Sequence, residues 1–383
     1  MSTLRVILDQ LIAPVPGGVG RYAENLAREL VRSAPAGWSV DGLLPSVSGA
    51  ELARVSARLP ELAGIRELAM PRKLLAEAWR RGAVSGGGGS GADAVFAPSL
   101  FAPLGGRCMP TIVTIHDVVP WTFPETLTPR GAAWHRDMAE RAAKHAALIT
   151  APTAAVARAL EERLEPKAPI AVIPGAPSPE LVPLVPAAAE EVADRHRLPG
   201  RFILAVGTLE PRKRLEALVT ALGEEELQDV ALVIAGPAGW GDVHLSEIAG
   251  RAGVGADRVR PLGFVSNTDL AALYQLADAF IMPSREEGFG LPVVEAMRLG
   301  CPVVHSDAPA LVEVADGAGV AVELEREGED AAVFVRRLAE AIAGLLGDDE
   351  RREACIARGH ARAAAFSWGA SAESLWTRLA QIA

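Results

Sequence analysis

The chain has 383 residues, which is enough for two domains of ordinary size. Half of the residues are hydrophobic and only 5% are aromatic, a composition that favours helices packed on sheets over an aromatic-rich β-sandwich. The formal net charge is −10 at pH 7, with 19 basic and 17 acidic residues in positions 1–180 and 19 and 31 in the remainder, so no large basic excess supports nucleic-acid binding.

Short apolar runs alternate with amphipathic stretches in the first half of the chain. Strands are expected at residues 4–8, 94–97, 111–115, 147–150 and 170–173, and helices at residues 21–31, 129–145 and 153–164. This alternation predicts a parallel sheet with helices on both faces.

The same pattern restarts after a proline-rich stretch at residues 174–186. Strands are expected at residues 202–206, 230–235, 280–282, 302–305 and 319–324, and helices at residues 215–221, 267–276, 292–299, 350–365 and 371–382. The sequence therefore predicts an α/β chain of two doubly wound, Rossmann-like domains, residues 1–180 and 187–367, that face each other across a cleft lined by strand ends. The final helix, about 368–383, is predicted to cross back to the first domain.

The compartment is predicted from the cysteines and from the apolar segments. Cys108, Cys301 and Cys355 are far apart and form no C-x-x-C pair, which is typical of free thiols in a reducing compartment. No charged-then-apolar leader precedes the first expected strand, and no window approaches the ~20 apolar residues that span a bilayer. We expect a cytoplasmic protein, with peripheral attachment to the inner membrane face left open.

Two segments of the first half have open interpretations. Residues 71–81 mix basic, apolar and aromatic side chains, which suits either a helix lying on an anionic membrane or an ordinary solvated helix with a buried Leu/Trp face. Residues 85–91 read SGGGGSG, which is typical of a flexible surface loop or of an engineered linker. We assign no catalytic role to this loop.

The strongest motif runs from Glu287 to Glu295, where a strand is followed by a glycine-containing loop and then a helix. Pro292 suits the first helical turn, and the loop at Gly288–Leu291 presents backbone N–H groups at the helix N-terminus, which is a ready anion site. One carboxylate could bind a sugar hydroxyl and the other a ribose hydroxyl.

Three further motifs follow expected strands. Arg212 and Lys213 lie in the loop that begins at Gly207, where two cations can neutralise a diphosphate leaving group. The glycine-rich run Gly17-Gly18-Val19-Gly20 permits close approach to a phosphate or sugar, but it lacks the dinucleotide fingerprint. His116-Asp117 stands at the end of a strand, where the sites of α/β proteins collect.

Together these motifs resemble those of retaining glycosyltransferases of family 4, which have the two-domain GT-B fold. The resemblance also includes Leu262-Gly263-Phe264-Val265 and Pro283-Ser284-Arg285-Glu286-Glu287, and it covers nearly the whole chain. It implies an acceptor-side first domain and a second domain that binds a nucleotide-sugar.

The resemblance implies roles for individual residues. The catalytic set would be His116 near the reacting carbon, Glu287 on the donor sugar, and Arg212 and Lys213 on the diphosphate. The remaining donor-binding positions would be Gly18, Gly20, Gly207, Gly236, Val265, Gly288, Phe289, Gly290, Leu291 and Glu295.

Two departures from the family pattern stand out. Many relatives have Gly-Arg where this chain has Gly207-Thr208, so Arg212 is expected to take over part of the diphosphate contact. The usual Pro-Asn-Gly after the interdomain strand reads Pro174-Gly175-Ala176 here, which leaves the hinge without its usual sequence.

The implied reaction is retaining transfer of a hexosyl unit, mannose-like by family habit, to an acceptor hydroxyl. The donor would be a GDP- or UDP-linked sugar, with a dTDP-linked deoxysugar left open, and the acceptor a saccharide, a lipid-linked saccharide or a small molecule. We expect neither a metal ion nor a cofactor. The alternatives are a nucleotide-sugar epimerase, which needs no acceptor, a sugar phosphorylase, which needs free phosphate, and a binding protein that has lost catalysis.

Overall fold

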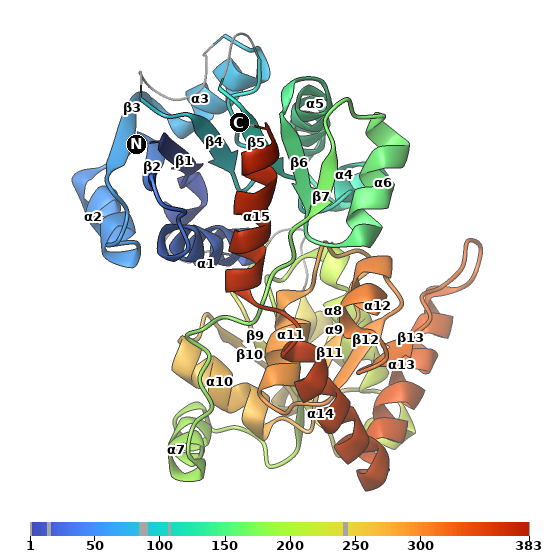
Figure 1. The fold of residues 1–383 in the computed structure, drawn as a ribbon. Coiled ribbons are helices and arrows are strands. Elements are labelled where there is room, and N and C mark those ends of the chain that lie inside the picture. Colours follow the sequence, from blue (N-terminus) through green and yellow to red (C-terminus); the bar gives the residue numbers. More distant parts are fainter. Residues whose placement is uncertain (1, 14–16, 84–90, 106–108, 240–243, 383) are drawn as a thin grey trace. The chain divides into compact units, whose positions relative to one another are not determined.

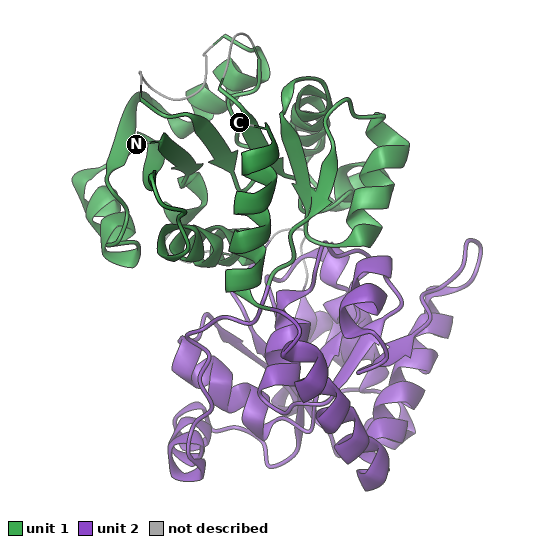
Figure 2. Cartoon of the chain, in the orientation of Figure 1, with its two compact units in different colours: residues 1–175, 367–383 green, residues 176–366 purple. Residues whose placement is uncertain are grey.

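The computed structural model describes residues 2–13, 17–83, 91–105, 109–239 and 244–382. The chain divides into two compact units, coloured separately in Figure 2. Unit 1 comprises residues 1–175 and 367–383, and unit 2 comprises residues 176–366. The chain therefore passes between the units twice, at Gly175–Ala176 and at Phe366–Ser367, and residues 176–180 belong to the second unit.

Unit 1 contains a wholly parallel sheet whose described strands number seven, in the order β3-β2-β1-β4-β5-β6-β7. The strands are β1 (Ser2–Ile7), β2 (Trp38–Ser46), β3 (Ile65–Pro71), β4 (Ala94–Ala97), β5 (Thr111–Thr114), β6 (Leu148–Ala151) and β7 (Ile170–Val172). The chain order reverses between β1 and β4, so the carboxyl ends of these strands mark the position where ligands bind in doubly wound sheets.

The helices of unit 1 connect and cover these strands (Figure 1). They are α1 (Gly18–Arg32), α2 (Gly49–Arg58), α3 (Arg72–Arg80), α4 (Val119–Thr122), α5 (Pro129–His145), α6 (Ala154–Leu164) and α15 (Trp368–Ile382). Side chains of α3, α5 and α6 share one apolar core with β4, β5 and β6. A continuous core of this kind is the main favourable contribution to folding.

The last helix, α15, packs on α1 within unit 1. Trp376 donates its indole N–H to the carbonyl of Leu30 at 3.2 Å, and its ring meets Trp38 edge-on at 5.5 Å. Ser371 donates to the carbonyl of Pro174 at 2.8 Å, so α15 is also tied to the segment that leaves β7.

Unit 2 repeats the architecture, with a parallel sheet of six described strands in the order β10-β9-β8-β11-β12-β13. The strands are β8 (Phe202–Val206), β9 (Ala231–Ala235), β10 (Val259–Gly263), β11 (Ala279–Met282), β12 (Val303–Ser306) and β13 (Val320–Val322). The order reverses between β8 and β11, which again places the switch point at the carboxyl ends of two neighbouring strands.

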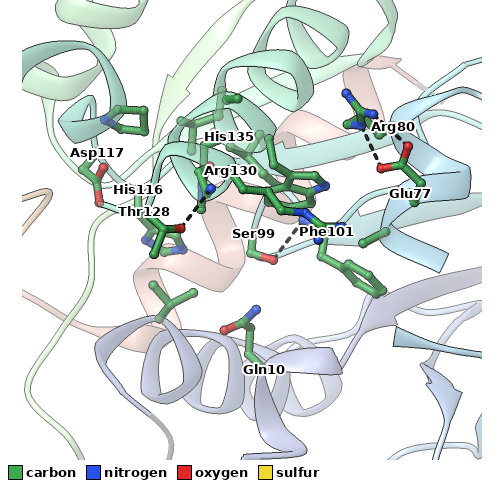
Figure 3. Close-up of a pocket in the computed structure, with 18 of the residues that line it drawn as sticks. Gln10, Glu77, Arg80, Ser99, Phe101, His116, Asp117, Thr128, Arg130 and His135 are labelled. Atoms are coloured by element: carbon green, nitrogen blue, oxygen red, sulfur yellow. Dashed lines mark hydrogen bonds and ion pairs between the residues drawn. The ribbon is translucent and has the colours of Figure 1, made fainter. Parts of the chain in front are cut away.

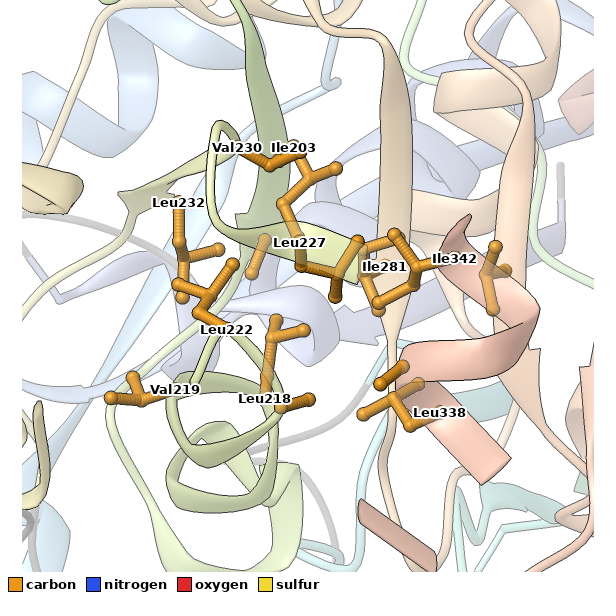
Figure 4. Packing of buried hydrophobic residues seen from close by; sticks show 14 of the residues in the cluster. Ile203, Leu218, Val219, Leu222, Leu227, Val230, Leu232, Ile281, Leu338 and Ile342 are labelled. Carbon is orange, nitrogen blue, oxygen red and sulfur yellow. The ribbon is translucent and has the colours of Figure 1, made fainter. Parts of the chain in front are cut away.

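The helices of unit 2 are α7 (Pro186–His196), α8 (Leu215–Ala221), α9 (Leu245–Arg251), α10 (Asn267–Leu276), α11 (Leu291–Arg298), α12 (Pro309–Ala315), α13 (Ala331–Leu346) and α14 (Asp349–Ala363). Figure 4 shows part of the main core, where Leu218 of α8, Leu222 just after that helix, and Leu338 and Ile342 of α13 meet the strands. Gly359, which weakens the sequence pattern of α14, lies where an added Cβ would sit 3.2 Å from Met297 of α11. A small residue at this position lets the two helices approach closely.

Several elements lie outside the sequence-based expectations, among them β2, β3, α2, α7, α12 and α13. Strand β2 illustrates why, because it carries Asp41 in its middle. Asp41 accepts two hydrogen bonds from Arg5 of the neighbouring β1, at 2.8 and 2.7 Å, and Arg5 is completely buried. Because the charge of Asp41 is compensated by a residue of another strand, the sequence of β2 alone does not show that this strand is buried.

The composition-based expectations have the following outcomes. Cys301 and Cys355 are buried free thiols, and Cys108 lies outside the described residues, as do residues 85–90 of the Gly/Ser segment. In the described part of the chain, no helix combines the length and apolar character needed to cross a membrane.

Candidate functional site

Three glycines end adjacent strands of the unit 2 sheet at its carboxyl edge. Gly207 follows β8 and donates its N–H to the carbonyl of Ala235, while Gly236 follows β9 and donates to the carbonyl of Gly263 in β10. A Cβ on Gly236 would lie 2.0 Å from the carbonyl oxygen of Gly207. Glycine at 236 therefore allows the loop after β8 to lie directly against the end of β9.

Backbone contacts join the loops that follow β8 and β11, the two strands at the switch point. The N–H of Arg285 donates to the carbonyl of Arg212 at 3.0 Å, and the guanidinium of Arg212 donates to the carbonyl of Glu286 at 2.6 Å. Two loops that lie more than 70 positions apart in the sequence are thus hydrogen-bonded to each other. The sequence motifs at 207–213 and 283–291 are brought together here.

Charged side chains of these loops form a tight cluster at Glu287. Its Oε1 lies 2.6 Å from Nζ of Lys213 and 2.8 Å from a guanidinium nitrogen of Arg212. Arg212 also pairs with Glu210 at 2.6 Å. The four side chains are between 7% and 18% exposed, so their charges interact in a poorly hydrated environment.

Burial and the neighbouring charges have opposite effects on the pKa values in this cluster. Burial by itself would raise the pKa of Glu287, but the charges of Arg212 and Lys213 and the hydrogen bond from Lys213 outweigh it and hold the pKa at about 2. Burial lowers the pKa of Lys213, an effect opposed by Glu287. Because a carboxylate with so low a pKa is a weak base, Glu287 suits hydrogen-bond acceptance better than proton abstraction.

Helix α11 starts immediately after this loop. Gly290 is its N-cap with φ +87°, and a Cβ there would lie 2.6 Å from Cδ2 of Leu311, so both backbone conformation and space favour glycine. Pro292 stands in the first turn as expected. The loop thus ends on backbone N–H groups of a helix N-terminus, where an anion is stabilised.

Three predicted donor contacts on this loop and helix are buried. Phe289 is 7% exposed and meets Phe366 edge-on at 5.2 Å, Leu291 is 8% exposed, and Glu295 is 1% exposed one turn into α11. Gly288 lies between Glu287 and these residues, and Val265 is half-buried just after β10. Their donor-binding roles, including the ribose contact of Glu295, stay predictions.

The glycine-rich motif of unit 1 opens helix α1. Gly17 is the N-cap, Gly18 is the first helical residue, and Gly20 is buried in the first turn. A Cβ at Gly17 or Gly18 would meet no atom of the described residues within 4 Å. The donor-binding roles of Gly18 and Gly20 stay predictions.

His116 follows β5 at the carboxyl edge of the unit 1 sheet. Its Nε2 lies 2.7 Å from the carbonyl oxygen of Pro98, and because a carbonyl can only accept, Nε2 carries the proton. Burial lowers the pKa of His116, so at neutral pH Nδ1 is a hydrogen-bond acceptor. Tyr22 of α1 meets the ring edge-on at 4.9 Å and packs against it.

A pocket of about 1070 Å³ lies wholly within unit 1 and includes His116 (Figure 3). Its walls come from α1, α3, α5, the segment after β4 and the end of β5. The charged and aromatic lining residues are Arg72, Lys73, Glu77, Arg80, Arg81, Phe101, His116, Asp117, Trp121, Arg130, Trp134 and His135. The pocket is concave, and its lining combines aromatic surface with many charged and polar side chains, which suits a polar small molecule.

Most of this pocket was not anticipated from the sequence. The basic segment at 71–81 was interpreted as either a membrane-surface helix or a solvated helix. The structure gives α3 a buried apolar face, with Leu75 and Trp79 each 1% exposed, and turns several of its charged side chains into the pocket. Leu74, at 62% exposure, faces outward. Membrane contact by this helix stays a prediction, testable by co-sedimentation with anionic vesicles at low and high salt.

The predicted site residues divide between the units. Gly18, Gly20 and His116 belong to unit 1, and the other positions belong to unit 2, where Arg212, Lys213 and Glu287 are in direct contact. Glu210, the second partner of Arg212, was missed, although it lies within the 207–213 motif. Across the residues that the structure describes, no group of three or more His, Cys, Asp or Glu side chains is placed to hold a metal ion.

Comparison with known families assigns both halves of the chain. Residues 16–180 match the family described as Glycosyltransferase Family 4, and residues 190–362 match Glycosyl transferases group 1. O-antigen chain mannosyltransferase B of Escherichia coli is 32% identical over 277 residues, which cover 71% of this chain and 70% of that protein. D-inositol 3-phosphate glycosyltransferase of Salinispora tropica is 34% identical over 220 residues, or 52% of this chain and 44% of that protein.

Solved structures share the fold at low sequence identity. The Anabaena protein Alr3699/HepE, solved in complex with UDP and glucose, superposes with a TM-score of 0.73 at 19% identity and complete coverage of both chains. Sucrose-phosphate synthase of Thermosynechococcus elongatus gives 0.73 at 20% identity, with 100% and 99% coverage. These neighbours confirm the predicted fold class of two Rossmann-like α/β domains.

Proposed function

We propose that this chain, which belongs to glycosyltransferase family 4, transfers a hexosyl unit from a nucleoside-diphosphate sugar to an acceptor hydroxyl with retention of configuration. The observation that carries the proposal is the Glu287–Lys213–Arg212 cluster at the start of α11. It combines a carboxylate for sugar hydroxyls, a cation and a helix N-terminus for a diphosphate.

In this mechanism the bond between the anomeric carbon and the diphosphate oxygen breaks while the acceptor oxygen bonds to the same face of that carbon. The acceptor hydroxyl proton passes to the departing diphosphate oxygen, so no protein base is required. Lys213 and the N-terminus of α11 stabilise the charge that develops on the diphosphate, and a preorganised donor of this kind contributes about 10²–10³ in rate.

Arg212 and Glu287 have different tasks from Lys213. The guanidinium of Arg212 is engaged by Glu210, Glu287 and the carbonyl of Glu286, so it holds the two loops together as well as supplying charge. Glu287 accepts hydrogen bonds from the donor sugar. In this scheme Nδ1 of His116, in unit 1, accepts a hydrogen bond from a sugar hydroxyl.

The donor is proposed to be GDP- or UDP-linked, and a structural neighbour that binds UDP supports a nucleotide of this class. Mannose is the favoured sugar because the similar Escherichia coli protein is a mannosyltransferase. The acceptor is a saccharide, free or lipid-linked, or another small molecule that carries a hydroxyl group. The chain needs no metal ion or cofactor in this scheme because lysine and backbone dipoles supply the positive charge.

The deciding experiment incubates the enzyme with a panel of nucleotide-sugars and acceptors, with and without EDTA. We expect acceptor-dependent release of nucleoside diphosphate, a product with the donor's anomeric configuration by NMR coupling constants, and the same rate in EDTA. Sugar interconversion without an acceptor would identify an epimerase, and dependence on free phosphate a phosphorylase. Donor binding without turnover would identify a binding protein, and loss of rate in EDTA that metal restores would overturn metal independence.

A further inference from the structure

More cationic than anionic side chains line the unit 1 pocket. Five cationic side chains line it, Arg72, Lys73, Arg80, Arg81 and Arg130, against two carboxylates, Glu77 and Asp117. A protein of net charge −10 thus concentrates positive charge around one cavity. An excess of one sign in a concave, partly apolar site attracts ligands of the opposite sign.

Three of the five cations are already paired. Arg72 donates to Asp9 at 2.8 and 3.0 Å, and Arg80 contacts Glu77 and Asp137, each at 2.7 Å. Arg81 contacts Glu77 at 2.8 Å. These pairs fix the pocket wall, because each guanidinium is held in place by a carboxylate.

The other two cations, Lys73 of α3 and Arg130 of α5, have a different status. Neither side chain has an ion pair or hydrogen bond to any residue that the structure describes. Both are exposed, and both belong to the pocket lining. They are the positive charges of this cavity that an incoming anion can take without breaking an existing contact.

Arg72 adds a third contact point of fixed geometry. Its guanidinium lies 5.1 Å from the ring centroid of Phe101, while its Nε and one terminal nitrogen are held by Asp9. The side chain is half exposed. A guanidinium oriented in this way loses little conformational entropy on binding an anion.

We propose that the unit 1 pocket takes a phosphorylated acceptor, with the phosphoryl group bound by Lys73 and Arg130 and flanked by Arg72. This inference rests on the proposed function, because it takes the pocket that His116 lines to be the place where the acceptor binds. The partly exposed aromatic side chains of Trp121 and Trp134 form the apolar surface on which a sugar ring can stack. A phosphorylated sugar supplies both kinds of contact.

The phosphoryl group can come from a water-soluble sugar phosphate or from a lipid-linked saccharide diphosphate. Calorimetric titration separates them when the donor loops are first saturated with the nucleoside diphosphate, which prevents phosphate from binding at Lys213. The soluble probes are a hexose 6-phosphate, a hexose 1-phosphate and the free hexose. The lipid probes are farnesyl diphosphate and farnesol in detergent.

We expect a phosphorylated probe to bind at least tenfold more tightly than its unphosphorylated counterpart. The double variant Lys73→Ala/Arg130→Ala should weaken that probe about 10- to 100-fold, since hydrogen bonds to charged groups contribute about 1.5–3 kcal/mol. The unphosphorylated counterpart should bind the double variant as it binds the wild type. Higher salt should weaken the wild type more than the double variant.

The matched control is Lys167→Ala/Arg158→Ala, which removes an exposed lysine and arginine of unit 1 that do not line the pocket. It should bind every probe as the wild type does. Equal affinity for phosphorylated and free probes, or equal loss in both double variants, overturns the inference. Nucleoside diphosphate affinity is recorded in the same titrations, so failure of the donor site is seen separately as loss of that affinity.

Discussion

The two ligand-facing regions of the molecule are built in opposite ways. In unit 2 the charges are paired with one another before any ligand binds, and Glu287, Lys213, Arg212 and Glu210 come from two short motifs. In unit 1 the pocket is assembled from six segments between residues 10 and 135, and Lys73 and Arg130 have no ion pair or hydrogen bond to any residue that the structure describes. The proposed diphosphate site is thus compact and prearranged, whereas the proposed acceptor pocket draws on many elements.

Removing the centre of the unit 2 cluster should have the largest effect. Lys213→Ala and Glu287→Ala should each lower kcat about 10²–10³-fold, the usual cost of one preorganised electrostatic contact. Glu287→Ala should in addition lower the free energy of unfolding by ~3–5 kcal/mol, because it removes the carboxylate that pairs with the poorly hydrated Lys213 and leaves Arg212 with Glu210 alone. Steady-state kinetics and chemical denaturation measure both effects.

The control for these variants is Glu323→Ala, which breaks surface pairs with Arg326 and Arg337 in the same unit. It should keep full activity and lose at most about 1 kcal/mol. Full activity in Lys213→Ala or Glu287→Ala would remove those residues from the site.

The unit 1 counterpart is His116. His116→Ala should lower kcat/KM by about 10- to 100-fold, a smaller effect that corresponds to the loss of one or two hydrogen bonds. Burial holds the pKa of His116 below 6.5, so the ring is neutral at pH 7 and is protonated only as the pH falls through that lowered value. Wild-type activity should therefore drop on the acidic side, and the His116→Ala profile should lack that limb. His145→Ala, an exposed histidine at the end of α5, is the control. Identical profiles for wild type and His116→Ala would contradict the assignment.

Two glycines of unit 2 allow the cost of packing at the start of α11 to be separated from the cost of backbone strain. Gly290 and Gly328 have nearly equal φ, +87° and +85°, but a Cβ at 290 would lie 2.6 Å from Leu311, whereas at 328 it would meet nothing within 4 Å. Both alanine variants carry the left-handed cost of about 1–2 kcal/mol. Gly290→Ala should lose about 1–3 kcal/mol more from overpacking and should also lower kcat. Equal stabilities would show that the loop yields without strain.

The pH dependence of stability gives the most specific signal. The pKa of Glu287 is about 2 in the fold and 4.5 ordinarily, so its stabilising contribution is complete above about 4.5 and is lost as the pH falls toward 2. Denaturation of wild type and Glu287→Gln between pH 2 and 6 should give curves that converge as the pH falls. Curves that stay parallel would mean that the cations do not hold this carboxylate.

The sequence predicted a good deal of the unit 2 site because its parts are local. Strand β8, the loop 207–213, strand β11 and the loop at 283–291 each read clearly, since a parallel strand is a short apolar run and its carboxyl-end loop carries the glycines and charges. That Arg212 touches Glu286 and Glu287 follows from β8 and β11 being neighbours, which no local pattern specifies.

By itself, then, the sequence determined the fold class and the family, because these depend on periodicity and on residues close together in the chain. Only the tertiary structure decided that β2 carries one member of a buried Arg5–Asp41 pair and that α3 turns charged side chains toward a cavity. It also decided that Lys73 and Arg130 line the same pocket as His116 without an ion pair or hydrogen bond to any described residue. The physical reason is that compensation of charge is a property of distance in space, and residues that neutralise one another, or fail to, can lie anywhere along the chain.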